Sequence, residues 1–134
     1  MPRPKHEQPT PAELEVLQVL WERGPATVRE VMDALNARRP RAYTSVMSLL
    51  NVMTDKRLLK QTSRGRAFLY EARAEREKTL GRIVEDVLGR AFEGSASALV
   101  ARLLDQASPS TDELDEVRRA IDAYQAQQPR QEKE

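Results

Sequence analysis

Short polar side chains gather on one face of a helix predicted over residues 43–56. The members of this face are Thr44, Ser45, Ser48 and Asn51, and none of them carries a charge. Hydroxyl groups both donate and accept hydrogen bonds, and an asparagine amide can pair with adenine. The face therefore has the chemistry to contact base edges or phosphates. A solvated helix surface is the alternative, which the absence of acidic residues disfavours.

Basic residues flank this helix. Residues 38–66 contain eight Arg or Lys against one carboxylate, Asp55, which gives a local charge of +7 in a chain whose net charge is +1. Such a cluster can neutralise phosphates and release their counterions, although it could also be an ordinary solvated surface. The predicted DNA-contacting residues are Arg41, Tyr43, Thr44, Ser45, Ser48, Asn51, Arg64 and Arg66.

Enzymatic chemistry has little support in the sequence. Cysteine is absent, and the single histidine, His6, stands in a Pro-rich start. We find no Gly-rich phosphate loop, no cluster of metal-ligand residues and no activated nucleophile. We expect no catalytic residue, metal or cofactor. No apolar run is long enough for a membrane helix or a signal peptide, so we expect a cytoplasmic protein without membrane insertion.

The elements that position the polar face are predicted from capping and periodicity. Helices are expected over residues 11–23 and from about 28 to 38 before the helix at 43–56, because each of the first two starts with a Thr-x-x-Glu cap. Strands are expected at 58–62 and 67–70 around a turn at 63–66 that contains Gly65. Three helices followed by a hairpin predict a winged helix-turn-helix with a two- or three-stranded wing, within a mainly helical chain.

The remaining chain is predicted to form a helical dimerisation domain. Helices are expected from about 74 to 92, around 99–104, and from 111 onward. Their apolar stripes would be exposed on a single chain, which favours a second copy as the partner. Packing back on the chain's own domain is the alternative. The predicted dimer residues are Leu80, Ile83, Val84, Val87, Leu88, Phe92, Leu99, Leu103, Leu114, Val117, Ile121 and Tyr124.

The predicted organisation therefore has four parts. A disordered arm covers residues 1–9, the winged-helix DNA-binding domain 10–72, the helical dimerisation domain 73–126, and a disordered tail 127–134. A dimer would present two recognition helices to successive major grooves, which predicts a palindromic operator on double-stranded DNA.

Through these motifs the sequence resembles the BlaI/MecI/CopY family of penicillinase repressors. The matching stretches, in the family's order, are 14–21, 24–31, 42–51, 65–70 and 94–104. The resemblance implies a winged-helix repressor that acts as a homodimer on palindromic promoter sites, typically of β-lactam-resistance or copper-handling genes. It also implies inactivation by a membrane sensor-protease pathway that cuts the C-terminal domain.

The sequence departs from the family pattern in four ways. Asn51 is followed by Val-Met where the family often has Arg-Leu, and Lys56 is followed by Arg57 where Gly is usual, so the turn must accommodate a side chain or change shape. The place of the cleaved Asn-Phe bond reads Arg102-Leu103. The C-terminal cysteines of copper-responsive relatives are absent.

Two other functions are compatible with the sequence. A MarR-like regulator would release DNA on binding a small ligand, in a pocket between the DNA-binding and dimer regions. A winged-helix adaptor would bind proteins without nucleic acid, but it has no need for eight cations around a hydroxyl-bearing helix. We expect repression by occupation of the operator, with no covalent chemistry.

Overall fold

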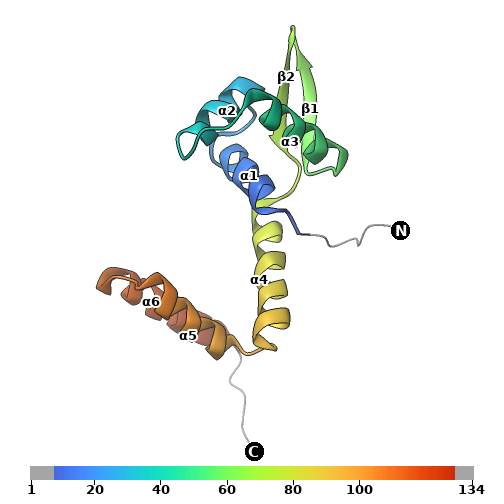
Figure 1. Cartoon of the computed structure of the whole chain (residues 1–134). Coiled ribbons are helices and arrows are strands. Elements are labelled where there is room, and N and C mark those ends of the chain that lie inside the picture. The colour runs from blue at the N-terminus through green and yellow to red at the C-terminus, as the bar shows by residue number, and fades with distance from the viewer. Residues whose placement is uncertain (1–7, 129–134) are drawn as a thin grey trace, which may run out of the picture. The chain divides into compact units, whose positions relative to one another are not determined.

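The computed structural model describes residues 8–128, which form six helices and one hairpin (Figure 1). In chain order they are α1 (Pro11–Arg23), α2 (Val28–Asn36), α3 (Tyr43–Asp55), β1 (Leu59–Arg64), β2 (Ala67–Ala72), α4 (Arg76–Phe92), α5 (Ala96–Ala107) and α6 (Thr111–Gln127). The predicted fold class, a mainly helical chain with a winged helix, is confirmed. The arm and tail predictions, with His6, fall largely on residues 1–7 and 129–134, outside the described residues.

The starts of α1 and α2 are fixed by the capping boxes that the sequence predicts. The Thr10 hydroxyl accepts from the Glu13 N–H at 3.2 Å, while the Glu13 carboxylate accepts from the Thr10 N–H at 3.0 Å. Thr27 and Glu30 repeat this exchange at the start of α2. Each box satisfies two N–H groups that a helix start leaves without partners, so both helices begin where the sequence predicts.

One apolar core unites α1, α2, α3 and the hairpin. It consists of Val16, Leu17, Leu20, Ala26, Val31, Leu35, Val46, Leu50, Met53, Leu59 and Tyr70. The helical members recur at three- and four-residue spacing, because that period places them on one face. Tyr70 also exchanges two backbone hydrogen bonds with Ala26, of 2.8 and 2.9 Å. This isolated bridge ties the hairpin to the loop before α2. It adds Ala26 as a third, single-residue strand beside β1 and β2 of the wing.

The hairpin is longer and tighter than the sequence predicts. β1 and β2 are antiparallel and pair from Leu59↔Ala72 to Arg64↔Ala67, which leaves Gly65 and Arg66 as a two-residue turn. The prediction of a four-residue turn was wrong, since Ser63 and Arg64 belong to the strand. Gly65 has φ 61°, a left-handed conformation that a tight hairpin requires and that glycine adopts without steric cost.

The chain divides into two compact units, with the boundary between Asp86 and Val87 inside α4. In the second unit, α5 is longer than the predicted 99–104 because Ser95 caps it at Ala98 N–H. α6 reaches Gln127, the first residue of the predicted tail. Of the helices described, none has the length and hydropathy needed to cross a membrane.

Candidate nucleic-acid interface

The predicted polar face of α3 is exposed. Val46, Leu50 and Met53 turn inward and are at most 1 % exposed. The opposite side of the helix carries exposed side chains, those of Thr44, Ser45, Ser48 and Asn51. The first unit thus holds α3 by its apolar stripe and leaves its uncharged hydrogen-bonding groups open to a ligand.

The start of α3 differs from the starts of α1, α2, α5 and α6. Ala42 is its N-cap and provides no side-chain hydrogen bond, so the first backbone N–H groups of α3 lack a cap. Tyr43, the first residue of the helix, is 46 % exposed, and the Arg29 guanidinium lies 5.9 Å from the centre of its ring. Uncapped N–H groups and the positive end of the helix dipole favour an anion near this end.

Two carboxylates of α1 hold the two ends of α3. Glu15 Oε1 accepts a hydrogen bond from Arg41 Nη2 at 2.7 Å, just before α3 begins. Glu13 Oε2 accepts from Lys56 Nζ at 2.7 Å, just after α3 ends. Each pair joins segments far apart in the sequence, so the tilt of α3 on α1 is fixed at both ends by charge-assisted hydrogen bonds.

The Glu13 carboxylate is almost fully buried, with 3 % of its side chain exposed. Burial by itself would raise the pKa of Glu13. The hydrogen bonds from Lys56 and from the Thr10 N–H, together with the Lys56 charge, outweigh burial and lower the pKa of Glu13 below its ordinary value. The carboxylate is therefore held in its charged form, with one oxygen on the α1 cap and the other on Lys56.

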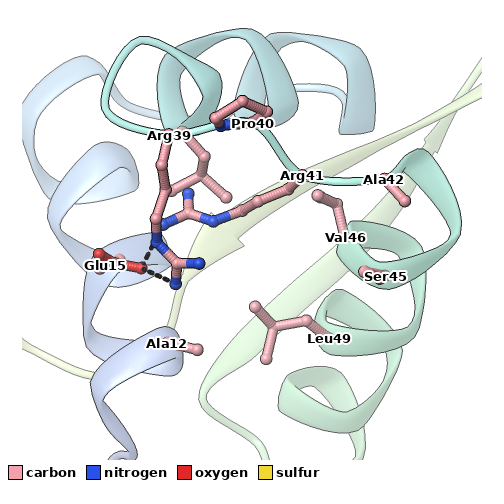
Figure 2. Close-up of a pocket in the computed structure, with 10 residues that line it drawn as sticks. Ala12, Glu15, Arg39, Pro40, Arg41, Ala42, Ser45, Val46 and Leu49 are labelled. Atoms are coloured by element: carbon pink, nitrogen blue, oxygen red, sulfur yellow. Dashed lines mark hydrogen bonds and ion pairs between the residues drawn. The ribbon is translucent and has the colours of Figure 1, made fainter.

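Arg41 lies differently from the other predicted DNA-contacting cations. Its side chain is only 11 % exposed, and it turns toward Glu15 on α1 (Figure 2). Arg39 approaches the same carboxylate oxygen at 3.8 Å. The Arg41 Nη1 atom is buried and has no hydrogen-bond partner among the described residues.

These contacts correct the charge count of the basic segment. Arg39, Arg41 and Lys56 are three of its eight cations, and all three face carboxylates of α1 that lie outside residues 38–66. Including Glu13 and Glu15 lowers the local charge from +7 to +5. The capping pattern revealed Glu13, but nothing local indicated that either carboxylate reaches the α3 region.

The wing carries the other two arginines that were predicted to contact DNA. Arg64 ends β1 and Arg66 lies in the turn, and both are exposed. Arg64 acts electrostatically on Glu30. The pKa of Glu30 is lowered, first by the hydrogen bond from the Thr27 N–H and further by the charges of Arg23 and Arg64. The wing tip thus adds two solvent-facing guanidiniums to the first unit.

The turn after α3 shows how the chain accommodates Arg57 where a glycine is expected. The Leu58 N–H donates to Met53 O at 2.9 Å and the Arg57 N–H to Thr54 O at 3.0 Å, the pair of bonds that usually closes a helix on glycine. Arg57 itself has φ 68°. The turn keeps the glycine-type shape, and the arginine adopts the left-handed conformation.

The predicted dimer residues are not buried within the single chain. Val84, Val87, Leu103, Ile121 and Tyr124 are 38–64 % exposed. The others are intermediate, namely Leu80, Ile83, Leu88, Phe92, Leu99, Leu114 and Val117. No residue of α5 or α6, both described in full, is buried.

The predicted cleavage position lies inside α5. Arg102 and Leu103 are both exposed, and Leu103 is 55 % exposed. Their peptide bond is in the middle of a twelve-residue helix, so its carbonyl and N–H groups belong to the helical hydrogen-bond pattern.

Comparisons with known proteins identify relatives of this chain among transcriptional regulators. The penicillinase repressor family model matches residues 9–123. Transcriptional regulator BlaI of Mycobacterium tuberculosis is 35 % identical over 116 residues, which cover 85 % of this chain and 83 % of that protein. The penicillinase repressor of Bacillus licheniformis is 22 % identical over 113 residues, covering 84 % and 88 %.

A solved structure supports the fold. The transcriptional regulator Tm0710 from Thermotoga maritima superposes with a TM-score of 0.50 at 17 % identity, covering 91 % of this chain and 80 % of that one. At this identity the likeness concerns the fold alone.

Proposed function

The chain belongs to the penicillinase repressor family of transcriptional regulators, and from this premise we propose that it is a homodimeric repressor that binds a palindromic operator in cytoplasmic DNA. The observation that carries the proposal is that one unit exposes both the uncharged face of α3 and the arginines of the wing. In a helix-turn-helix, such a face enters the major groove and its side chains contact base edges.

We assign recognition of the DNA base sequence to α3 and phosphate binding to the wing. Thr44, Ser45 and Ser48 lie near the start of the helix, the part of a recognition helix that contacts bases. Arg64 and Arg66 are exposed and make no ion pair within the described chain, so they are available to phosphates or a narrow minor groove. The operator itself would be identified by selection from a random duplex pool.

The wing is tested by a salt titration of duplex binding. Replacing Arg64 and Arg66 by Ala should lower affinity and reduce the dependence of log affinity on log salt by about 1.8, because about 0.9 is expected for each lost phosphate contact. The matched control replaces Arg118 and Arg119, two exposed arginines of α6, and should leave the slope unchanged. An unchanged slope in the wing variant removes the wing from the interface.

The α3 face is tested by specificity. Thr44→Ala with Ser48→Ala should lower the ratio of selected-duplex to random-duplex affinity by roughly tenfold, since each good base contact contributes about 1–3 kcal/mol. Equal losses on both duplexes would show that these hydroxyls contact phosphate only.

The dimer is assigned to the exposed apolar side chains of α4, α5 and α6. Removing such surface from water stabilises association by about 25 cal/mol per Å². Leu103→Asp should convert the dimer to monomers in sedimentation velocity and weaken operator binding. Ala101→Asp adds the same charge on another face of α5 and should remain dimeric. A dimeric Leu103→Asp protein would place the interface elsewhere.

For relief of repression we propose that a membrane sensor-protease pathway leads to cleavage of the Arg102–Leu103 bond. α5 would have to open locally first, because proteases bind an extended backbone and this bond is helical. Intact mass of the protein recovered from cells treated with a β-lactam tests this step. A full-length chain under conditions in which the target gene is induced contradicts it.

A further inference from the structure

A pocket of about 490 Å³ lies between α1 and α3, beneath the link that joins α2 to α3 (Figure 2). Its volume is within the range of about 300–1,000 Å³ that small-molecule sites occupy. Ala12, Val46 and Leu49 form part of an apolar wall, while Glu15, Arg39 and Arg41 provide the charged groups. An apolar wall with a few converging polar groups suits an amphipathic ligand.

The charged part of the pocket has a surplus positive charge. Two guanidiniums, those of Arg39 and Arg41, share one oxygen of Glu15 at 3.8 and 2.7 Å. The Arg41 Nη1 atom is buried without a hydrogen-bond partner in the described chain, an arrangement that buried donors rarely show. The Arg39 side chain is 64 % exposed, so it can turn toward an incoming anion without disturbing the core.

The start of α3 adds to this positive field. Ala42 and Ser45 line the pocket, and α3 begins at Ala42 without a side-chain cap. In contrast, α1, α2, α5 and α6 each begin with a Thr or Ser whose hydroxyl accepts a hydrogen bond from the first turn. The uncapped helix start and the two arginines therefore favour the same kind of ligand, an oxyanion.

We propose that this pocket binds a small organic carboxylate whose apolar body lies along Ala12, Val46 and Leu49 and whose carboxylate is bound by Arg39. The apolar wall supplies affinity for the body, and the surplus charge selects an acid over its neutral amide. The residues that line the pocket all belong to the winged helix, whereas the MarR-like alternative would need a pocket between the DNA-binding and dimer regions.

Binding of the acid also regulates the protein, a consequence that rests on the proposed DNA-binding function. Ser45 lines the pocket and belongs to the exposed α3 face that we propose contacts DNA. An acid in the pocket adds a negative charge beside the start of α3 and occupies Arg39, so it opposes the approach of a phosphate. Acid and duplex therefore lower each other's affinity by the same factor.

Calorimetric titration of the full chain tests binding without DNA. Phenylacetate, 3-phenylpropionate and 4-phenylbutyrate are each compared with the corresponding amide. At least one acid should bind saturably with one site per chain. Its amide should bind at least about tenfold more weakly, because a charge-assisted hydrogen bond is lost. Equal binding of acid and amide, or no saturable binding of any acid, overturns the proposal.

Three variants locate the site. Arg39→Gln should weaken the acid about tenfold, whereas Arg38→Gln, an exposed neighbour that does not line this pocket, should bind as the wild type does. Ala12→Leu fills the space from α1 and should abolish binding, with circular dichroism and thermal melting confirming that it folds. Wild-type binding by Ala12→Leu or Arg39→Gln overturns the assignment to this pocket.

Fluorescence anisotropy with a labelled duplex tests the regulation. The selected acid at saturation should lower duplex affinity of the wild type and leave that of Ala12→Leu unchanged. If duplex affinity does not respond, the regulatory link is overturned while the calorimetric site stands. If no duplex binds at low salt without acid, the proposed DNA-binding function fails, and calorimetry still decides the pocket.

Discussion

In the first unit, apolar stripes from α1, α2 and α3 close on one another and on the hairpin within a single chain. All buried apolar side chains of the described residues lie between Val16 and Tyr70. In the second unit, α5 and α6 are just as periodic, but they bury no residue. Leu50 is fully buried, whereas Leu103 is 55 % exposed, although both occupy apolar positions of amphipathic helices.

The two units differ in whether other segments of the same chain cover the apolar faces of their helices. The first unit has three helices and a hairpin around one centre, so each stripe meets another from the same chain. The second unit contains apolar side chains without such a centre, and exposed apolar surface in water favours association. This contrast is the physical basis for assigning DNA binding to the self-contained α1–α3 and hairpin core and dimerisation to α4, α5 and α6.

The largest expected effect is loss of a core side chain in the first unit. Leu50→Ala should lower the free energy of unfolding by about 3 kcal/mol at every protein concentration, because it leaves a cavity. Urea unfolding followed by Trp21, the single tryptophan, reports on this unit. Leu103→Ala should change that transition by less than about 0.5 kcal/mol. A similar loss in both variants would contradict the contrast between the units.

Removing the cationic partner of the buried Glu13 carboxylate tests how α1 holds α3. Lys56→Met should destabilise the first unit by about 3 kcal/mol, because it leaves the Glu13 carboxylate buried without its partner. Lys78→Met removes a lysine that is 70 % exposed and should cost less than about 0.5 kcal/mol. If the two variants unfold at the same urea concentration, the buried pair does not contribute as proposed.

Lowering the pH should weaken the contact between Glu13 and Lys56. The pKa of Glu13 is lowered in the fold, so its stabilising contribution is complete above the ordinary glutamate pKa of about 4.3 and is lost as pH falls through the lowered value. Wild type and Glu13→Gln should therefore converge in unfolding free energy below about pH 4. A difference that stays constant from pH 7 to pH 3 would argue against a charged Glu13.

The smallest expected effect is a gain. Arg57 adopts a left-handed conformation at the end of α3, so Arg57→Gly should stabilise the first unit by about 1 kcal/mol. Arg57→Ala removes the same charge but keeps the Cβ, and it should give little of this gain. Equal stabilisation by both variants, measured by urea unfolding, would assign the effect to charge instead of backbone strain.

Much of the fold could be predicted because its signals are local. The capping boxes at Thr10 and Thr27 fixed the starts of two helices, and apolar periodicity identified Val46, Leu50 and Met53 as the inward side of α3. The hairpin was predicted from Gly65, but the predicted turn was two residues too long. Ser63 and Arg64 are compatible with either a strand or a turn, so the sequence did not separate the two. The exposure of the predicted α3 face followed from the same periodicity.

Contacts between distant segments could not be read in this way. Arg41 was predicted as a DNA contact from its place in a basic segment, yet its guanidinium turns to Glu15, 26 residues earlier. Lys56 meets Glu13 across 43 residues. A charge count along the sequence cannot include partners that only folding brings near.

The amino-acid order by itself therefore determined the helices, the hairpin and which side of each helix is apolar, because caps, turns and periodicity act over a few residues. Only the tertiary structure decided which cations remain available to a ligand. It also decided where the pocket beside α3 forms and which apolar faces find partners within one chain, because these depend on which distant residues the packing of α1 on α3 brings together.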